Sequence, residues 1–162
     1  MEYTKNTDPN YFIAYPEESN CGSYALNVEE WYDPESELFN LVGYINEWID
    51  ELYDMGYSVD EIADIYAEKL VEKILSDFEG EIREIYYPSE VDTDEELIAF
   101  RGWCYVDIDN WVDYDFHFKV FRDGFWKEKC GHGPVRFCTE DDWSYGFRTY
   151  NSETIYFAHK IN

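Results

Sequence analysis

Positive charge is scarce in this sequence. The 162 residues include 12 Lys and Arg against 37 Asp and Glu, which gives a formal net charge of −25. A surface of this sign repels phosphate backbones and anionic lipids, and it attracts basic proteins with a strength that falls as the salt concentration rises. We therefore expect no direct contact with nucleic acid or with a membrane.

Long apolar runs are absent as well. No segment approaches the roughly 20 apolar residues that a membrane-spanning helix needs. The first residues, Met1 to Lys5, have neither the basic nor the apolar region of a signal peptide. These absences predict a cytoplasmic protein.

Closely spaced metal ligands are also missing. The 4 cysteines include no Cys-x-x-Cys pair, and they are Cys21, Cys104, Cys130 and Cys138. Cytosolic cysteines are usually free thiols, and zinc sites built on cysteine need such pairs. An acidic cluster lacks the central glycine and the terminal glutamate of an EF-hand loop, and it consists of Asp107, Asp109, Asp113 and Asp115. We expect free thiols, solvated carboxylates, no metal and no cofactor.

Aromatic residues, by contrast, make up 20% of the chain. Disordered acidic chains contain few aromatic residues, so this content predicts a folded core, and the length suits one domain over residues 1–162. The charge is uneven, because residues 1–100 hold 27 of the acidic residues and only 4 of the basic ones. The negative surface should therefore belong to the first part of the domain.

The first half of the chain has the periodicity of helices. Ser58 is followed three residues later by Glu61, as in a capping box, and apolar residues then recur at helical spacing to about Phe78. An earlier amphipathic segment, Glu37 to Met55, ends before Gly56, a residue type suited to helix C-termini. These patterns predict two helices that form a hairpin.

The second half of the chain has the pattern of strands. Strands are predicted over Arg83–Tyr87, Leu97–Asp107, Tyr114–Phe121 and Thr154–Ile161. Asp123-Gly124 predicts a two-residue hairpin turn, because both residue types tolerate the positive φ of a type I′ turn. Helices over about 20–80 followed by an antiparallel meander over about 82–161 indicate an α+β fold, with the helices packed on the sheet.

The predicted hairpin fixes a register between its two strands. If Asp123-Gly124 is the turn, His117 lies opposite Cys130 and Lys119 lies opposite Glu128. Since side chains alternate along a strand, His117 and Glu128 then share one face as diagonal neighbours. A histidine beside a carboxylate is the arrangement that holds the ring of a catalytic base.

A candidate nucleophile precedes all of these elements. Cys21 follows Asn20 and opens a short apolar segment, Gly22 to Leu26, which is typical of a helix start. A cysteine at a helix N-terminus is favoured as the thiolate, and a histidine from a later strand can serve as its base. This reasoning predicts Cys21, His117 and Glu128 as catalytic residues.

The motifs around these residues resemble a known group of proteins. The strings Asn20-Cys21-x-x-Tyr24-Ala25-Leu26 and Asp115-x-His117-Phe118, followed by Asp123-Gly124-x-Trp126-x-x-Lys129-x-Gly131, resemble bacterial domains related to papain-like and NlpC/P60 cysteine peptidases. That resemblance implies a papain-like fold, Cys21 as nucleophile and His117 as base. The chain has Gly22-Ser23 where the group usually has Tyr-Ala, and Glu128 where it usually has His.

The resemblance implies amide hydrolysis of a peptide or protein, or descent from such an enzyme with loss of catalysis. The simpler alternatives are that Cys21 is a small buried apolar residue, that His117 packs among aromatic side chains, and that Glu128 pairs with Lys119 across the hairpin. These alternatives remain open at the level of the sequence.

A different function would use the charge alone. A small acidic, aromatic-rich protein could imitate nucleic acid and bind the basic channel of a nucleic-acid-handling protein, as phage inhibitors of restriction or CRISPR systems do. The carboxylates for this binding would come from the two helices, and they are Asp50, Glu51, Asp54, Asp60, Glu61, Asp64 and Glu68.

Overall fold

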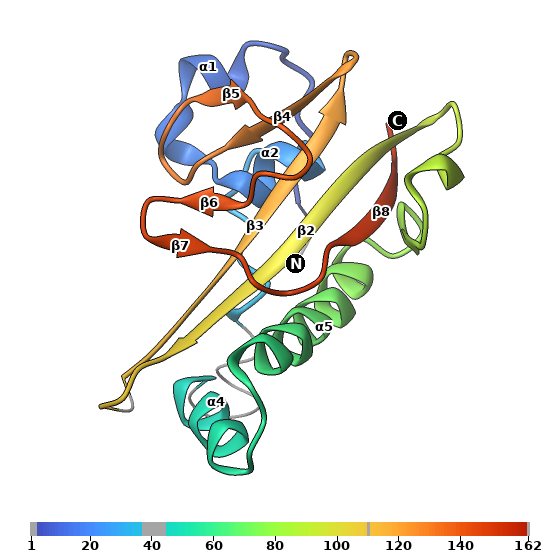
Figure 1. Ribbon diagram of the computed structural model, residues 1–162. Helices are drawn as coiled ribbons and strands as arrows, with labels where there is room; N and C mark the ends of the chain where they lie inside the picture. The colour runs from blue at the N-terminus through green and yellow to red at the C-terminus, as the bar shows by residue number, and fades with distance from the viewer. Residues whose placement is uncertain (1–2, 37–44, 110, 162) are drawn as a thin grey trace.

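The computed structural model describes residues 3–36, 45–109 and 111–161, and it has an α+β fold (Figure 1). The described helices are α1 (Tyr11–Ala14), α2 (Cys21–Leu26), α4 (Ile45–Asp54) and α5 (Val59–Asp77), with short 3-10 turns at Pro16–Glu18 and Pro88–Glu90. The strands are β1 (Ile82–Ile85), β2 (Glu95–Val106), β3 (Val112–Arg122), β4 (Phe125–Lys129), β5 (Val135–Phe137), β6 (Ser144–Tyr145), β7 (Arg148–Thr149) and β8 (Ile155–Lys160).

The main sheet has six strands in the order β1-β8-β2-β3-β4-β5, and its recorded pairings are antiparallel. Strands β2 to β5 follow one another as the predicted meander. The last strand, β8, departs from it by inserting between β1 and β2, where Phe157 faces Ile98 and Glu84. A strand that fills a central position late in the chain depends on long-range pairing, which no local pattern specifies.

Helix α5 lies along one face of the sheet beside β2 (Figure 1). Its capping box is confirmed, because the Ser58 hydroxyl accepts from the Glu61 N–H and the Glu61 carboxylate accepts from the Ser58 N–H, both at 3.1 Å. Helix α4 ends at Asp54, and Gly56 follows two residues later with a φ of +97°, which suits glycine. The predicted helix from Glu37 is described only from Ile45, since residues 37–44 lie outside the described residues.

Two apolar clusters cover the two faces of the sheet. The larger one joins α2, α4 and α5 to residues of β2 and β3 such as Phe100 and Phe118, both fully buried. The smaller one lies on the opposite face, where Trp143 and Tyr150 cover Ala99 and Trp103. The segment that carries β6 and β7 thus closes the face of the sheet to which His117 belongs. Among the described residues, no helix is both long enough and apolar enough to span a bilayer.

Candidate active site

Helix α2 places Cys21 in its first turn. Asn20 is the N-cap, since its Oδ1 accepts from the Ser23 N–H at 2.9 Å while the Ser23 hydroxyl accepts from the Asn20 N–H at 3.2 Å. The Asn20 amide also donates to the carbonyl of Tyr32 at 2.6 Å. These buried bonds fix where the chain enters the helix and therefore where the Cys21 side chain begins.

A fully buried lysine anchors the chain just before Cys21. Lys129, at the end of β4, donates to the carbonyls of Pro16, Ser19 and Gly131, with 2.5 Å between Nζ and the Ser19 oxygen. Burial lowers the pKa of this ammonium, whereas the nearby thiols Cys21 and Cys130 raise it. The lysine thus ties α2 to β4.

The hairpin that carries the candidate base has the predicted turn. Asp123 and Gly124 have φ of +54° and +83°, and Arg122 pairs with Phe125, as expected for a two-residue type I′ turn. The ladder continues only to the Val120–Lys127 pair, so the predicted direct pairs His117–Cys130 and Lys119–Glu128 lie beyond it. Helix α2 contacts both strands (Figure 1).

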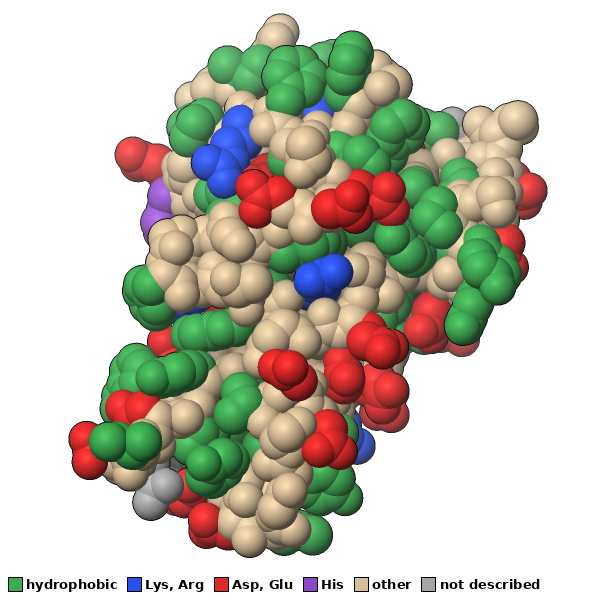
Figure 2. All heavy atoms as spheres, viewed as in Figure 1, with side chains coloured by type: hydrophobic (Ala, Val, Ile, Leu, Met, Phe, Trp, Pro, Cys, Tyr) green, Lys and Arg blue, Asp and Glu red, His purple; other side chains and the backbone are tan. Residues whose placement is uncertain are grey.

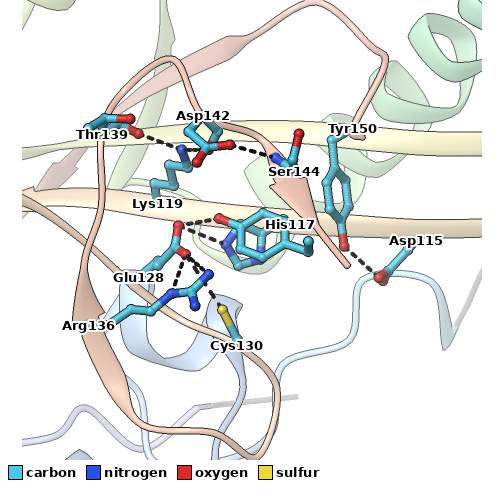
Figure 3. A network of polar contacts seen from close by, with 11 residues as sticks. Asp115, His117, Lys119, Glu128, Cys130, Arg136, Thr139, Asp142, Ser144 and Tyr150 are labelled. Carbon is cyan, nitrogen blue, oxygen red and sulfur yellow. Dashed lines mark hydrogen bonds and ion pairs between the residues drawn. The ribbon is translucent and has the colours of Figure 1, made fainter. Parts of the chain in front are cut away.

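The predicted contact between His117 and Glu128 is present although the ladder ends before these residues. The ring Nε2 lies 3.6 Å from Oε1 of Glu128, and both side chains are buried. Glu128 also accepts from Arg136 Nε at 2.9 Å and from the Tyr145 hydroxyl (Figure 3). Burial alone raises the pKa of this carboxyl, but the His117 ring, Tyr145 and Arg136 together lower it to about 2. Glu128 is therefore an ionised, well-held partner for the ring.

Lys119 does not take the role of cross-strand partner of Glu128. Its Nζ donates to the carbonyls of Thr139, at 2.6 Å, and Asp142 (Figure 3). It also lies 4.3 Å from the centre of the Trp143 ring. The alternative in which Glu128 serves mainly to pair with Lys119 is therefore not what the structure shows. Lys119 instead fastens the segment that leads into β6.

Cys21 and His117 line one cavity of about 400 Å³, together with Asp33, Glu35, Asp115 and Cys130. Tyr145 and Tyr150 also line it, with ring centres 4.3 and 5.7 Å from that of His117. The two candidate catalytic side chains, from segments about a hundred residues apart, thus face a common space. Glu128 lies behind the ring, at its Nε2, which leaves Nδ1 as the nitrogen available to a proton donor.

The expected thiolate at Cys21 is contradicted by its surroundings. The side chain is buried, and burial raises the pKa of the thiol to about 12, although hydrogen bonds from the backbone N–H groups of Phe118 and Gly22 lower it. Helix α2 has only six residues, so its dipole is weak compared with this loss of solvation. The resting form is the neutral thiol.

His117 is neutral as well. Burial among aromatic rings lowers its pKa, and this effect exceeds the opposite effects of Glu128 and Asp115. A neutral imidazole within reach of a neutral thiol can act as a general base at the moment of attack, because proton transfer then accompanies bond formation. The cavity is therefore lined by a neutral thiol and a neutral imidazole rather than by a thiolate and an imidazolium.

Several residues of this site have no motif in the sequence. Asp115, expected to be solvated, instead accepts from the Tyr150 hydroxyl at 2.7 Å and from Arg148 Nη1 at 2.6 Å. Arg136 and Tyr145 hold Glu128 from β5 and β6. Their positions depend on how the segment after β5 folds back over the sheet, and a short run of aromatic and basic residues around Gly146 is the only local signal of this segment.

One cluster in the site has the composition of a metal site. Ligand atoms of His117, Glu128 and Cys130 lie within 4.8 Å of one another. However, Arg136 already neutralises Glu128, with Nη2 2.9 Å from Oε2. A divalent cation would have to displace this guanidinium, so the cluster suits proton transfer better than metal binding.

Acid should weaken the fold through Glu128. Because the pKa of this carboxyl falls from 4.5 to about 2 on folding, its ionisation contributes stability above pH 4.5 that is lost as the pH falls through 2. The contribution is about 3 kcal/mol. In urea unfolding between pH 7 and pH 2, Glu128→Gln should therefore lose less stability than the wild type by about this amount. The exposed Glu84→Gln should behave as the wild type, and equal losses in all three proteins would contradict the account.

Gly22 lets α2 approach the strand that carries His117. A Cβ at this position would lie 3.0 Å from Cδ2 of Tyr32 and 3.2 Å from Cε2 of Phe118. Gly22→Val should therefore lower the free energy of unfolding by about 1–3 kcal/mol and slow reactions at Cys21, since α2 must move away from β3. Ala14→Val, an exposed change in α1, is the control for β-branching, and an equal effect of both changes would exclude the packing argument.

Comparison with protein-family models, with curated proteins and with solved structures finds no match for this chain.

Proposed function

We propose that the protein is a cysteine hydrolase that cleaves an amide by acyl transfer, in the manner of the papain-like and NlpC/P60 peptidases that its motifs resemble. The observation that carries this proposal is the shared cavity of Cys21 and His117, with Glu128 held 3.6 Å behind the ring. A nucleophile, a base and a group that orients the base are the parts that such a reaction needs.

The proposed reaction begins with attack of the Cys21 sulfur on the carbonyl carbon. His117 takes the thiol proton as the carbon–sulfur bond forms, and Glu128 stabilises the resulting imidazolium. His117 then gives the proton to the leaving amine as the carbon–nitrogen bond breaks. Water, deprotonated by His117, hydrolyses the thioester and restores the thiol. The backbone N–H of Cys21, at the start of α2, stabilises the oxyanion.

The lining of the cavity favours a basic or neutral peptide. Asp33, Glu35 and Asp115 contribute carboxyl groups, and Arg148 is engaged by Asp115 and lies 3.7 Å from Asp113. Burial raises the pKa of Glu35 to about 9, so this group is protonated at neutral pH and can donate a hydrogen bond. An anionic substrate would meet repulsion from the remaining carboxylates.

An activated ester tests the proposal without knowledge of the natural substrate. Paranitrophenyl acetate should acetylate Cys21 with loss of paranitrophenolate, and water should then release the acetyl group as acetate. Both steps are followed by mass spectrometry of the digested protein. Cys138 is the internal control, because burial raises the pKa of its thiol to about 12 as well while its side chain is more exposed. Faster acetylation of Cys21 than of Cys138 is expected, and slower acetylation would count against the proposal.

The exposed acidic residues of the helices support a second candidate function, binding to a basic protein surface in place of nucleic acid. Five of the seven predicted carboxylates are exposed, and they are Glu51, Asp54, Asp60, Glu61 and Glu68. Acidic side chains also greatly outnumber basic ones on the face in Figure 2. Two of the seven also serve the fold, because Asp60 accepts from the Asn151 amide at 3.1 Å and Asp64 accepts from the Glu153 N–H at 2.7 Å. The catalytic proposal rests on a more specific arrangement.

A further inference from the structure

A second cavity, of about 500 Å³, lies away from the candidate active site and shares no lining residue with it. Its walls come from the N-terminal segment with α1, the β3–β4 hairpin, β5 and the end of β8. These segments gather at one end of the sheet, where the tip of the hairpin and the C-terminal end of the chain lie (Figure 1). Its volume is in the range of pockets that bind small organic molecules.

The charge of this cavity is opposite to that of the protein. Five of the 12 basic residues of the chain line it, namely Lys5, Arg122, Lys127, Arg136 and Lys160. Only two acidic residues, Glu96 and Asp123, stand among its lining residues. In a chain with a net charge of −25, this is a local concentration of positive charge.

Three of these cations are available to a ligand. Arg122 is bound to Glu96 by two bonds of 2.6 and 2.8 Å, and Arg136 is bound to Glu128. By contrast, Lys5 and Lys127 have only long ion pairs, 3.6 Å to Glu81 and 3.5 Å to Asp123. Lys160 is exposed, and no side-chain hydrogen bond or ion pair is recorded for it among the described residues. Long, solvated ion pairs are weak and exchange readily for a better-placed anion.

A buried histidine in the wall lacks the hydrogen bonds that it needs. His159 is 2% exposed, and neither ring nitrogen has a partner among the described residues. Burial lowers its pKa to about 4, against the opposite effects of Glu96 and Glu81, so the ring is neutral and carries one N–H donor. Buried polar groups in native proteins nearly always have a hydrogen-bond partner, so the N–H of the His159 ring still needs an acceptor.

The rest of the wall is apolar. The cavity is lined by the apolar parts of Phe12, Tyr24 and Val135. Two further apolar side chains that line it are exposed to solvent, Ile13 to 74% and Phe137 to 71%. Lys127 Nζ lies 5.9 Å from the centre of the Phe137 ring, so charge and apolar surface adjoin. We propose that this cavity binds a small organic carboxylate with an apolar body, whose head group lies among the lysines that line the cavity. This proposal is independent of the proposed catalytic function.

Three related compounds test the inference on the intact protein by NMR titration of backbone amides and the His159 ring. Octanoate carries both the charge and the apolar body, acetate carries the charge alone, and octanamide carries the apolar body alone. Octanoate should produce saturable shifts at His159 and at the β3–β4 hairpin. Acetate and octanamide should bind at least tenfold more weakly, because each lacks one of the two features.

Charge-removing variants complete the test. The double change Lys127→Gln and Lys160→Gln should weaken octanoate binding at least tenfold, whereas Lys69→Gln, an exposed change on α5, should leave it unchanged. Spectra of the free variants show whether each is folded. The inference is overturned if octanoate gives no saturable shift at His159, if octanamide binds as tightly as octanoate, or if the folded double variant binds octanoate like the wild type.

Discussion

His117→Ala should lower the rate of acetylation of Cys21 by about 10²- to 10⁴-fold, the range typical of a general base. The reason is the resting state of the site. Because burial holds the pKa of Cys21 near 12, almost no thiolate exists at neutral pH without a base to take the proton. The rate is measured by mass spectrometry of the Cys21 peptide after timed reaction with paranitrophenyl acetate.

The matched control for this change is His132→Ala. His132 is an exposed histidine in the loop after β4, where its Nδ1 lies 3.1 Å from the Glu17 carbonyl oxygen. It should leave the rate at Cys21 unaltered. An equal loss of rate in both variants, or no loss in His117→Ala, would show that the imidazole of His117 does not act on the thiol.

Lys129→Met should destabilise the protein by about 3–5 kcal/mol, the range for removing one partner of a buried charged group. Lys129 is fully buried, and methionine would fill its space while leaving the carbonyls of Pro16, Ser19 and Gly131 without this donor. Urea unfolding at neutral pH measures the loss. The exposed Lys69→Met should change the free energy of unfolding by less than about 0.5 kcal/mol.

The same lysine connects stability to the candidate site. Since Lys129 fixes the chain that leads into α2, its replacement should also displace Cys21 from the cavity and slow acetylation of the thiol. If Lys129→Met is as stable as the wild type, the three short bonds contribute little and α2 must be held by its capping box alone.

Local features were predictable because they depend on neighbouring residues. The Asp123-Gly124 turn follows from the positive φ that both residue types tolerate, and the start of α5 follows from Ser58 and Glu61. The contact between His117 and Glu128 followed from that turn, since a two-residue turn fixes which side chains share a face. The candidate pair was therefore available from the sequence.

Features that depend on distant segments were not predictable in this way. The place of β8 between β1 and β2, and the cover of β6 and β7 over His117, need contacts between residues far apart in the chain. The prediction of a thiolate at Cys21 was wrong for the same reason. The pKa of the thiol is set by how deeply the side chain is buried and not by the position of Cys21 in α2. The three carbonyl acceptors of Lys129 likewise have no sequence pattern.

The rate of alkylation of Cys21 by iodoacetamide as a function of pH tests the central claim most directly. If a neutral His117 removes the proton during attack, the wild-type rate should be nearly constant between about pH 6.5 and 9, because the lowered pKa of His117 keeps the ring unprotonated there. In His117→Ala the rate should be much lower and rise about tenfold per pH unit, following the thiolate. A wild-type rate that rises in the same way as that of His117→Ala would contradict the account and leave Cys21 as a buried structural thiol.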